Sequence, residues 1–290
     1  MKPNLEYGEA LLANEDKFQD AFFRRFSLRK GAAPFRLDDK VSRDYLFPIF
    51  YADVTCAMGI FMCDYRKAQA ILPSSKLKPV RMTRGRSLVL LSCYQYRNVM
   101  HLRPYNELAM MIPVMADPAV NVPVLPMVTP FFGNLGYYAF GILVTSTENA
   151  LRGTIWGLRK TVREVDLLDE GEECVAVARE ASGASTVELR VPKGGSVKEF
   201  DVKTRLYAPR EGAIIRSEVC FKGSFRVTKY MKCLAAKGLE PDRSYLKIGD
   251  GEPAGVLRYL ELERHPFQLR YAERIDSTLD LPDPAFRLSA

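Results

Sequence analysis

Hydrophobic and polar positions alternate along most of the chain after residue 45, which is typical of β-strands. Tyr45–Met62 is rich in aromatic and β-branched residues and carries little charge apart from Asp53. Ser87–Tyr96 contains the run Leu-Val-Leu-Leu between polar residues, and Glu107–Val114 has its proline near one end, as an edge or terminal position requires. Further strands are predicted at Cys174–Glu180, Thr186–Val191, Ile214–Cys220, Gly255–Glu263 and Gln268–Ile275, although Gly255–Glu263 could instead be helical.

The helical signals are short. Asp64 is the expected N-cap of a helix that runs towards Leu72 and is stopped by Pro73, and Ser146 or Thr147 could cap a second helix. Nothing repeats at a fixed period, so a solenoid or propeller is not expected. Clear β-α-β alternation is also missing, which excludes a Rossmann fold. These patterns predict a large, mainly antiparallel β domain with a few short helices.

Residues 1–40 form a polar, partly helical N-terminal extension, and residues 41–290 form the predicted β domain. Ala10–Phe23 has loosely helical apolar spacing, and Phe22–Phe26 mixes aromatic residues with cations. Such a segment could lie on a membrane surface. We favour packing against its own domain or a partner subunit.

Composition narrows the function classes. The chain has 290 residues, of which 47% are hydrophobic, and a net charge of +7, which favours anions such as small carboxylates. Its basic residues are scattered without a nucleic-acid-binding motif, so no nucleic acid is expected as a partner. The apolar run Met110–Phe132 is interrupted by five prolines, so no membrane span is predicted. With no signal peptide at the N-terminus and no C-x-x-C pair among the six cysteines, we expect a cytoplasmic protein with free cysteines and no metal.

One lysine in an apolar context raises a chemical possibility. Leu151–Arg163 holds the single tryptophan, Trp156, followed by Gly157 and then Lys160. Keeping a lysine amine neutral at pH 7 costs about 4.6 kcal/mol relative to its ordinary pKa of ~10.4. A neutral amine can attack a carbonyl carbon and form a Schiff base. For an arbitrary lysine, composition alone favours a surface position with a buried stem.

Three segments support the chemical interpretation. Ile155–Lys160 resembles the signature of the acetoacetate decarboxylase family, in which an Ile/Leu-Trp-Gly-aromatic-Pro-Lys-Lys run carries the Schiff-base lysine. Tyr105–Glu107, followed by Met111–Val114, is similar to the family's Tyr-x-Glu…Ile-Pro-Val strand, and Asp64–Pro73 is similar to its early helix. The segments occur in family order over residues 50–165. The chain is therefore identified as a divergent member.

This resemblance implies a closed, cone-like antiparallel β-barrel, usually assembled as a homo-oligomer, that needs no cofactor or metal. It implies that Lys160 is the nucleophile and that Glu107 orients the substrate or moves a proton. From the residues alone, we favour a strand glutamate that pairs with an arginine such as Arg97 or Arg103. His101 could approach the same site. The substrate-binding residues expected around the lysine are Tyr105, Phe131, Phe132, Tyr137, Tyr138, Trp156, Ser92 and Arg159.

The chain departs from the family pattern in its charged residues. The lysine that follows the Schiff-base residue is Thr161 here, the preceding proline is Arg159, and a second acidic position is Ser92. The early strand Tyr51–Cys63 contains no arginine. We therefore expect a bulkier, partly apolar keto acid in place of acetoacetate, anchored by Arg159 or by Arg97 or Arg103. The leading hypothesis is a lyase that decarboxylates a β-keto acid. The alternatives are a pyruvate aldolase–dehydratase that uses the same lysine and a non-enzymatic binding protein of the same fold.

Overall fold

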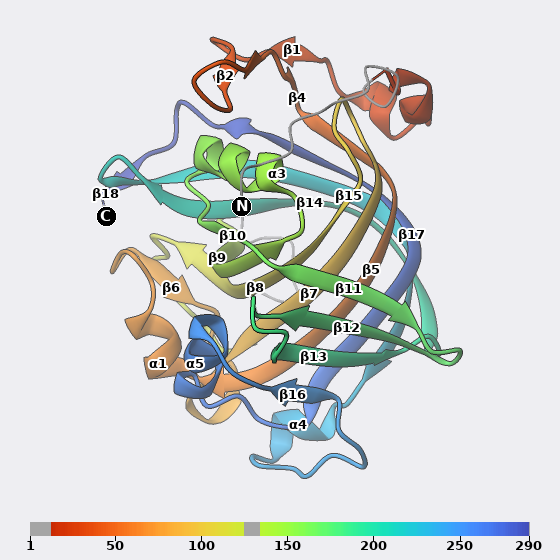
Figure 1. The fold of residues 1–290 in the computed structure, drawn as a ribbon. Helices are drawn as coiled ribbons and strands as arrows, with labels where there is room; N and C mark the ends of the chain where they lie inside the picture. The colour runs from red at the N-terminus through yellow and green to blue at the C-terminus, as the bar shows by residue number, and fades with distance from the viewer. Residues whose placement is uncertain (1–12, 125–133, 290) are drawn as a thin grey trace.

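A closed β-barrel forms the body of the protein in the computed structural model, which describes residues 13–124 and 134–289 (Figure 1). Within these residues, seven strands close in the order β9, β14, β15, β17, β5, β7 and β8, with β8 pairing back to β9. All neighbours are antiparallel except β9 and β14. Their bounds are β5 Ile49–Asp64, β7 Arg86–Val99, β8 Tyr105–Ala116, β9 Leu135–Val144, β14 Ser196–Arg210, β15 Ala213–Lys229 and β17 Pro266–Pro282. The predicted closed, mainly antiparallel barrel is confirmed.

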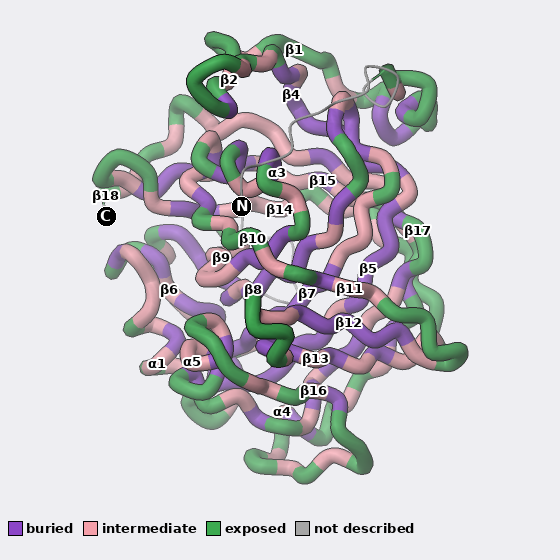
Figure 2. The backbone as a smooth tube through the Cα atoms, in the orientation of Figure 1, coloured by how far each residue is buried: buried purple, intermediate pink, exposed green. Residues whose placement is uncertain are grey.

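A smaller antiparallel sheet covers one side of the barrel, as Figure 1 shows. It consists of β11 (Glu164–Asp169), β12 (Glu173–Arg179), β13 (Ser185–Pro192) and β16 (Leu246–Ile248). Leu189 of this sheet belongs to the same buried cluster as Phe61 and Leu91 of the barrel. The strands beneath it are consequently buried on both faces (Figure 2). Burial on both faces explains the unbroken apolar run Leu-Val-Leu-Leu within Ser87–Tyr96.

The two faces of β7 separate the outer core from the barrel interior. Leu91 and Cys93 lie in the core under the small sheet, whereas Leu90 and Tyr94 line a cavity inside the barrel. This division follows from the two-residue period of a strand. The interior of the barrel is therefore built by alternate residues of each long strand.

The helices are short and lie at the ends of strands. The α-helices are α1 (Tyr65–Ala70), α3 (Thr147–Arg152), α4 (Lys232–Ala235) and α5 (Glu252–Tyr259), and the 3-10 turns are η2 (Glu15–Phe18), η3 (Phe23–Arg25), η4 (Thr83–Gly85) and η5 (Gly153–Trp156). Asp64 caps α1 by accepting from the Lys67 amide, and Ser146, not Thr147, caps α3. The segment 255–263, whose pattern allowed a strand or a helix, is helical up to Tyr259, where α5 ends.

Short strands complete the structure. They are β1 (Arg29–Lys30), β2 (Phe35–Arg36), β3 (Ser42–Arg43), β4 (Leu46–Phe47), β6 (Leu77–Pro79), β10 (Lys160–Val162) and β18 (Leu288–Ser289). Strand β10 runs parallel to β9 and pairs Lys160 with Ile142. This pairing brings the start of β10 to the barrel wall.

The described part of the N-terminal extension packs against the barrel. The segment expected to be helical over Ala10–Phe23 contains, from residue 13 onward, separate 3-10 turns. Phe18, Phe22 and Phe23 are buried in one cluster with Phe50 of β5, and Arg25 pairs with Asp201 of β14 at 2.9 Å. Contacts within the chain therefore account for the aromatic and cationic residues of this segment.

Two further expectations concern the whole chain. All six cysteines are free and buried, as predicted. Among the described residues, no helix combines the length and apolar character that a membrane crossing would require.

Candidate active site

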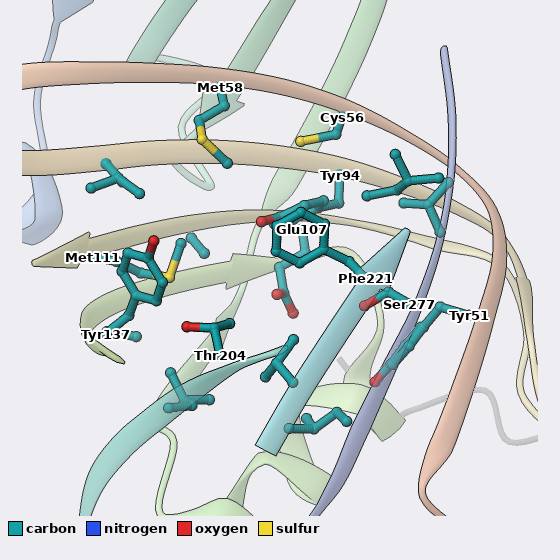
Figure 3. A pocket seen from close by; sticks show the side chains of 18 of the residues that line it. Tyr51, Cys56, Met58, Tyr94, Glu107, Met111, Tyr137, Thr204, Phe221 and Ser277 are labelled. Carbon is teal, nitrogen blue, oxygen red and sulfur yellow. The ribbon is translucent and has the colours of Figure 1, made fainter. Parts of the chain in front are cut away.

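A cavity of about 160 Å³ lies inside the barrel and is walled mainly by apolar and aromatic side chains. Strands β5, β7, β8, β9, β14, β15 and β17 all contribute to its wall. Figure 3 shows the carboxylate of Glu107 directed into this space, with Tyr94 and Phe221 on one side and Thr204 on another. A carboxylate in such surroundings has little water to solvate it, so its neighbours determine its chemistry.

Lys160 provides the partner of that carboxylate. Its Nζ donates to Oε2 of Glu107 at 2.7 Å and to Oδ1 of Asn149 at 2.7 Å. The Lys160 side chain is 5% exposed and that of Glu107 is 10% exposed. Both groups line the cavity. An amine and a carboxylate in direct contact on a dry wall can exchange a proton without help from bulk water.

Two glycines allow the Lys160 side chain to take this position. Gly157 ends η5 with a φ of +66°, and a Cβ there would lie 2.5 Å from the Pro209 carbonyl oxygen. A Cβ on Gly153 would lie 3.1 Å from Cγ of Lys160 and 2.9 Å from the Leu158 carbonyl oxygen. Larger residues at either position would displace the turn or the lysine. The Trp-Gly part of the motif therefore shapes the chain that leads to Lys160.

Asn149 is a site residue that the sequence analysis missed. Its backbone amide donates to the Ser146 hydroxyl at the start of α3, and its side-chain Nδ2 donates to the Tyr105 hydroxyl at 2.8 Å. Because Nδ2 is bound to Tyr105, Oδ1 is turned towards Lys160. The signal available in sequence was its place three residues after a cap, in the helix that precedes the lysine motif.

Four tyrosines, Tyr51, Tyr94, Tyr96 and Tyr105, form an aromatic wall beside Glu107. The rings of Tyr51 and Tyr96 and those of Tyr96 and Tyr105 are each 4.8 Å apart between centroids. Burial raises the pKa of Tyr51 to about 12 and the pKa values of the other three well above their ordinary range. These phenols stay uncharged at neutral pH and can donate hydrogen bonds to a ligand.

Arg152 lies behind this wall and was also missed. It is fully buried, and its guanidinium nitrogens have no hydrogen-bond partner among the described residues. Its guanidinium carbon lies 4.3 Å from the centroid of the Tyr45 ring. Its charge opposes the rise in the pKa values of Tyr51 and Tyr105. Arg152 does not line the cavity, so it influences the site through the electrostatic effect of its charge on Tyr51 and Tyr105.

The structure divides the residues expected to bind substrate. Tyr105 and Tyr137 line the cavity, whereas Phe131 and Phe132 lie outside the described residues. Tyr138 does not line it, because neighbouring residues of a strand point to opposite faces; its ring packs against the outer core. Ser92 is fully buried and is not part of the cavity wall. The expectation is corrected for Tyr138 and Ser92.

Trp156 and Arg159, which were also expected to bind substrate, do not line the cavity. The indole Nε1 of Trp156 donates to the Asp280 carbonyl oxygen at 2.7 Å, and its ring lies 6.0 Å from that of Phe47. The tryptophan therefore fastens η5 to β17. Arg159 is exposed, as is Thr161, because both point away from the face that carries Lys160.

The arginines expected to replace the missing anchor are not in the cavity. Arg97 donates to Asp53 and Thr55, and neither it nor Arg103 lines the wall. The arginines in the wall are Arg205 of β14 and Arg270 of β17. His101 contacts Glu15, with Nε2 and Oε1 2.7 Å apart, and is also outside the cavity. Within residues 13–124 and 134–289, no group of three His, Cys, Asp or Glu side chains could hold a metal ion.

Solved structures with this architecture define the class of fold. Acetoacetate decarboxylase from Legionella pneumophila subsp. pneumophila str. Philadelphia 1 superposes with a TM-score of 0.58 at 11% identity and covers 99% of both chains. Another acetoacetate decarboxylase gives 0.56 at 12% identity, covering 83% of this chain and 89% of its own. The enduracididine biosynthesis enzyme MppR with HEPES buffer bound gives 0.57 at 13% identity, covering 83% and 88%. The barrel thus has the acetoacetate decarboxylase-like fold.

The sequence itself identifies the family. The family model for acetoacetate decarboxylase (ADC) matches residues 32–212. The chain therefore belongs to the acetoacetate decarboxylase family. No curated protein sequence matches it, which agrees with the divergence seen in its charged residues.

Proposed function

We propose that this protein is a cofactor-independent lyase that decarboxylates a β-keto acid through an imine on Lys160. The observation that carries this proposal is the buried contact between Lys160 and Glu107 on the wall of an apolar cavity. A buried ion pair rarely stabilises a fold more than apolar residues of the same volume would. A role in chemistry gives a reason for its presence here.

The first stage forms the imine. Glu107 takes a proton from the Lys160 ammonium group, and the free amine attacks the ketone carbon of the substrate. The protonated Glu107 then returns its proton to the hydroxyl of the carbinolamine, which leaves as water. The product is an iminium ion beside the Glu107 carboxylate. Asn149 holds the lysine nitrogen in line through the acceptor 2.7 Å away.

The second stage breaks the carbon–carbon bond. The electron pair of the bond to the carboxylate moves into the iminium group, so carbon dioxide leaves and an enamine remains. The enamine carbon takes up a proton, and water hydrolyses the resulting iminium ion to release the ketone and the lysine. The apolar wall assists because dispersing the carboxylate charge is favoured where that charge is poorly solvated.

Borohydride trapping tests the proposal. The protein is incubated with 3-oxohexanoate and sodium borohydride, digested, and examined by mass spectrometry. The reduced ketone adduct is expected on the peptide that contains Lys160, and Lys160→Ala should lose it. Release of carbon dioxide by the untreated protein is the second readout. Labelling at another lysine, or equal labelling of Lys160→Ala, would contradict the proposal, and no labelling at all would favour a binding protein.

A second activity uses the same imine. MppR, which shares the fold, has been solved complexed with pyruvate and with the condensation product of pyruvate and imidazole 4-carboxaldehyde. A pyruvate enamine on Lys160 would add to an aldehyde and then lose water. Product analysis separates the two activities, because only the first releases carbon dioxide. Light scattering of the purified protein tests the accompanying proposal that it is a homo-oligomer.

A further inference from the structure

Arg270 lines the cavity in addition to Lys160, Glu107 and Arg205, and no partner of opposite charge among the described residues accompanies it. Its Nε donates to Oε1 of Gln268 at 2.7 Å, and its guanidinium carbon lies 5.2 Å from the centroid of the Phe200 ring. These are a neutral acceptor and an aromatic face. Burial lowers the pKa of Arg270, which shows that its surroundings disfavour the cation. A bound anion would remove this cost.

Strand register relates Arg270 to Lys160 along one row of residues, and both line the cavity. Arg270 pairs with Met58, and the same row continues across the sheet through Ser92, Ala109 and Ile142 to Lys160. The row takes five steps between strands spaced ~4.8 Å apart, and the last step leads from β9 to the short strand β10. Arg270 and Lys160 therefore line the same cavity from different strands.

The surroundings of Lys160 and Arg270 differ in charge. The Lys160 ammonium is matched by the Glu107 carboxylate. The Arg270 guanidinium has no acidic partner among the described residues, and the neighbours that influence its charge are Tyr137, Cys56 and Tyr94. An arginine presents a planar set of donors suited to a carboxylate. The cavity is therefore complementary to a molecule that offers a carbonyl group to Lys160 and an anionic group to Arg270.

We propose that Arg270 binds a carboxylate that the reaction does not remove, so that the substrate class is a keto diacid. This inference rests on the proposed function of Lys160. The carboxylate β to the ketone leaves as carbon dioxide, its bonding electrons pass to the iminium group, and the enamine takes up a proton. The remote carboxylate stays on Arg270 throughout. A cation held on the departing carboxylate would instead stabilise the ground state and slow the reaction.

A matched substrate pair tests the assignment. 3-Oxoadipate and 3-oxohexanoate have the same carbon chain and differ only in a terminal carboxylate or methyl group. The wild-type protein should favour 3-oxoadipate by about 10- to 100-fold in kcat/KM, as expected for a charge-assisted contact. In Arg270→Met the ratio should fall close to one. Arg270→Lys should recover part of it, because a point charge replaces the planar fork.

Arg226→Met is the matched control. Arg226 lies next to this position on β15, opposite Tyr271, but is exposed to solvent. Removing it changes the net charge equally and should leave the substrate ratio at the wild-type value. A wild-type protein that does not distinguish the two acids would overturn the proposal, as would an Arg270→Met variant that keeps the ratio. Circular dichroism and Tm establish that each variant is folded.

Binding of unreactive acids separates failure of the anchor from failure of the chemistry. Calorimetry with adipate and hexanoate should show tighter binding of adipate by wild-type protein and by Lys160→Ala, and equal binding by Arg270→Met. If adipate binding follows this pattern while no keto acid is decarboxylated, the anchor stands and the proposed function fails. If decarboxylation occurs without a preference for adipate or 3-oxoadipate, the anchor fails and the proposed function stands.

Discussion

Oδ1 of Asn149 lies 2.7 Å from Nζ of Lys160, and both residues are held by separate elements that meet at the cavity wall. Asn149 is on α3 and Lys160 begins β10. The amide cannot rotate freely, because its Nδ2 is bound to Tyr105. The Lys160 nitrogen is therefore positioned by a neutral group in addition to its contact with Glu107.

Asn149→Ala should lower kcat/KM for 3-oxohexanoate by about tenfold or more, since a hydrogen bond to a charged group contributes roughly 1.5–3 kcal/mol. Single-turnover borohydride trapping would report the loss as slower imine formation. Ser146→Ala is the control, because it removes the cap of the same helix without touching Lys160. That control should cost about 1 kcal/mol of stability and retain the rate of trapping. Equal rates for Asn149→Ala and wild type would exclude a positioning role.

Glu107→Gln should reduce turnover by about 10²- to 10⁴-fold, because glutamine keeps the size of the side chain but cannot accept the proton. The variant should still bind hexanoate. Glu263→Gln is a matched change of a buried glutamate that pairs with Arg86 at 3.0 Å outside the cavity. It is expected to lower Tm with turnover maintained. Wild-type turnover in Glu107→Gln would remove this residue from the mechanism.

Trp156→Phe should destabilise the protein by about 1 kcal/mol through loss of the indole hydrogen bond to Asp280. Substrate preference should not change, since the indole is not part of the cavity wall. Urea unfolding gives the first quantity and the 3-oxoadipate to 3-oxohexanoate ratio gives the second. A changed ratio would show that Trp156 reaches the substrate after all.

Stability should fall steeply at alkaline pH. The pKa of Tyr51 is about 12 in the folded protein, above the value of ~10 expected in the unfolded chain. Below pH ~10, Tyr51 is protonated in both the folded and the unfolded protein, and its full contribution to the free energy of unfolding is present. Between pH ~10 and ~12 the unfolded chain loses its proton first, so about 2–3 kcal/mol is lost. Urea midpoints across this range should fall less steeply for Tyr51→Phe; parallel curves for the two proteins would contradict the assignment.

Local patterns in the sequence were sufficient for much of the architecture. Alternation of apolar and polar positions predicted the strands, because a strand shows its two faces at every second residue whatever its neighbours are. The cap at Asp64 and the stop at Pro73 depend only on nearby backbone groups, so α1 was also predictable. Arg159 and Thr161, the two neighbours of Lys160, are both exposed, as the same alternation requires of a strand, although Arg159 was expected at the site.

Tertiary structure alone decided which aromatic residues share the cavity with Lys160. Composition marks Trp156 and Tyr138 as candidates as readily as Tyr51 and Tyr94, because all four are aromatic and at least partly buried. Residue type does not show which face of a strand a side chain occupies. Closure of the barrel selects between them: Tyr51 and Tyr94 are on the interior side of β5 and β7, whereas Trp156 turns to the Asp280 carbonyl.

The charged and polar residues that face Lys160 could likewise not be identified from local sequence patterns. The early segment Tyr51–Cys63, which lies in β5, contains no arginine. Strand β17 is distant in the sequence but pairs with β5, and this pairing places Arg270 opposite Met58. The hydrogen bond from Lys160 to Asn149 likewise depends on how α3 docks beside β10. The motif around Lys160 was local and therefore readable from the sequence. The groups facing it come from strands whose pairing is set only when the barrel closes, because register is determined by the buried faces of all the strands together.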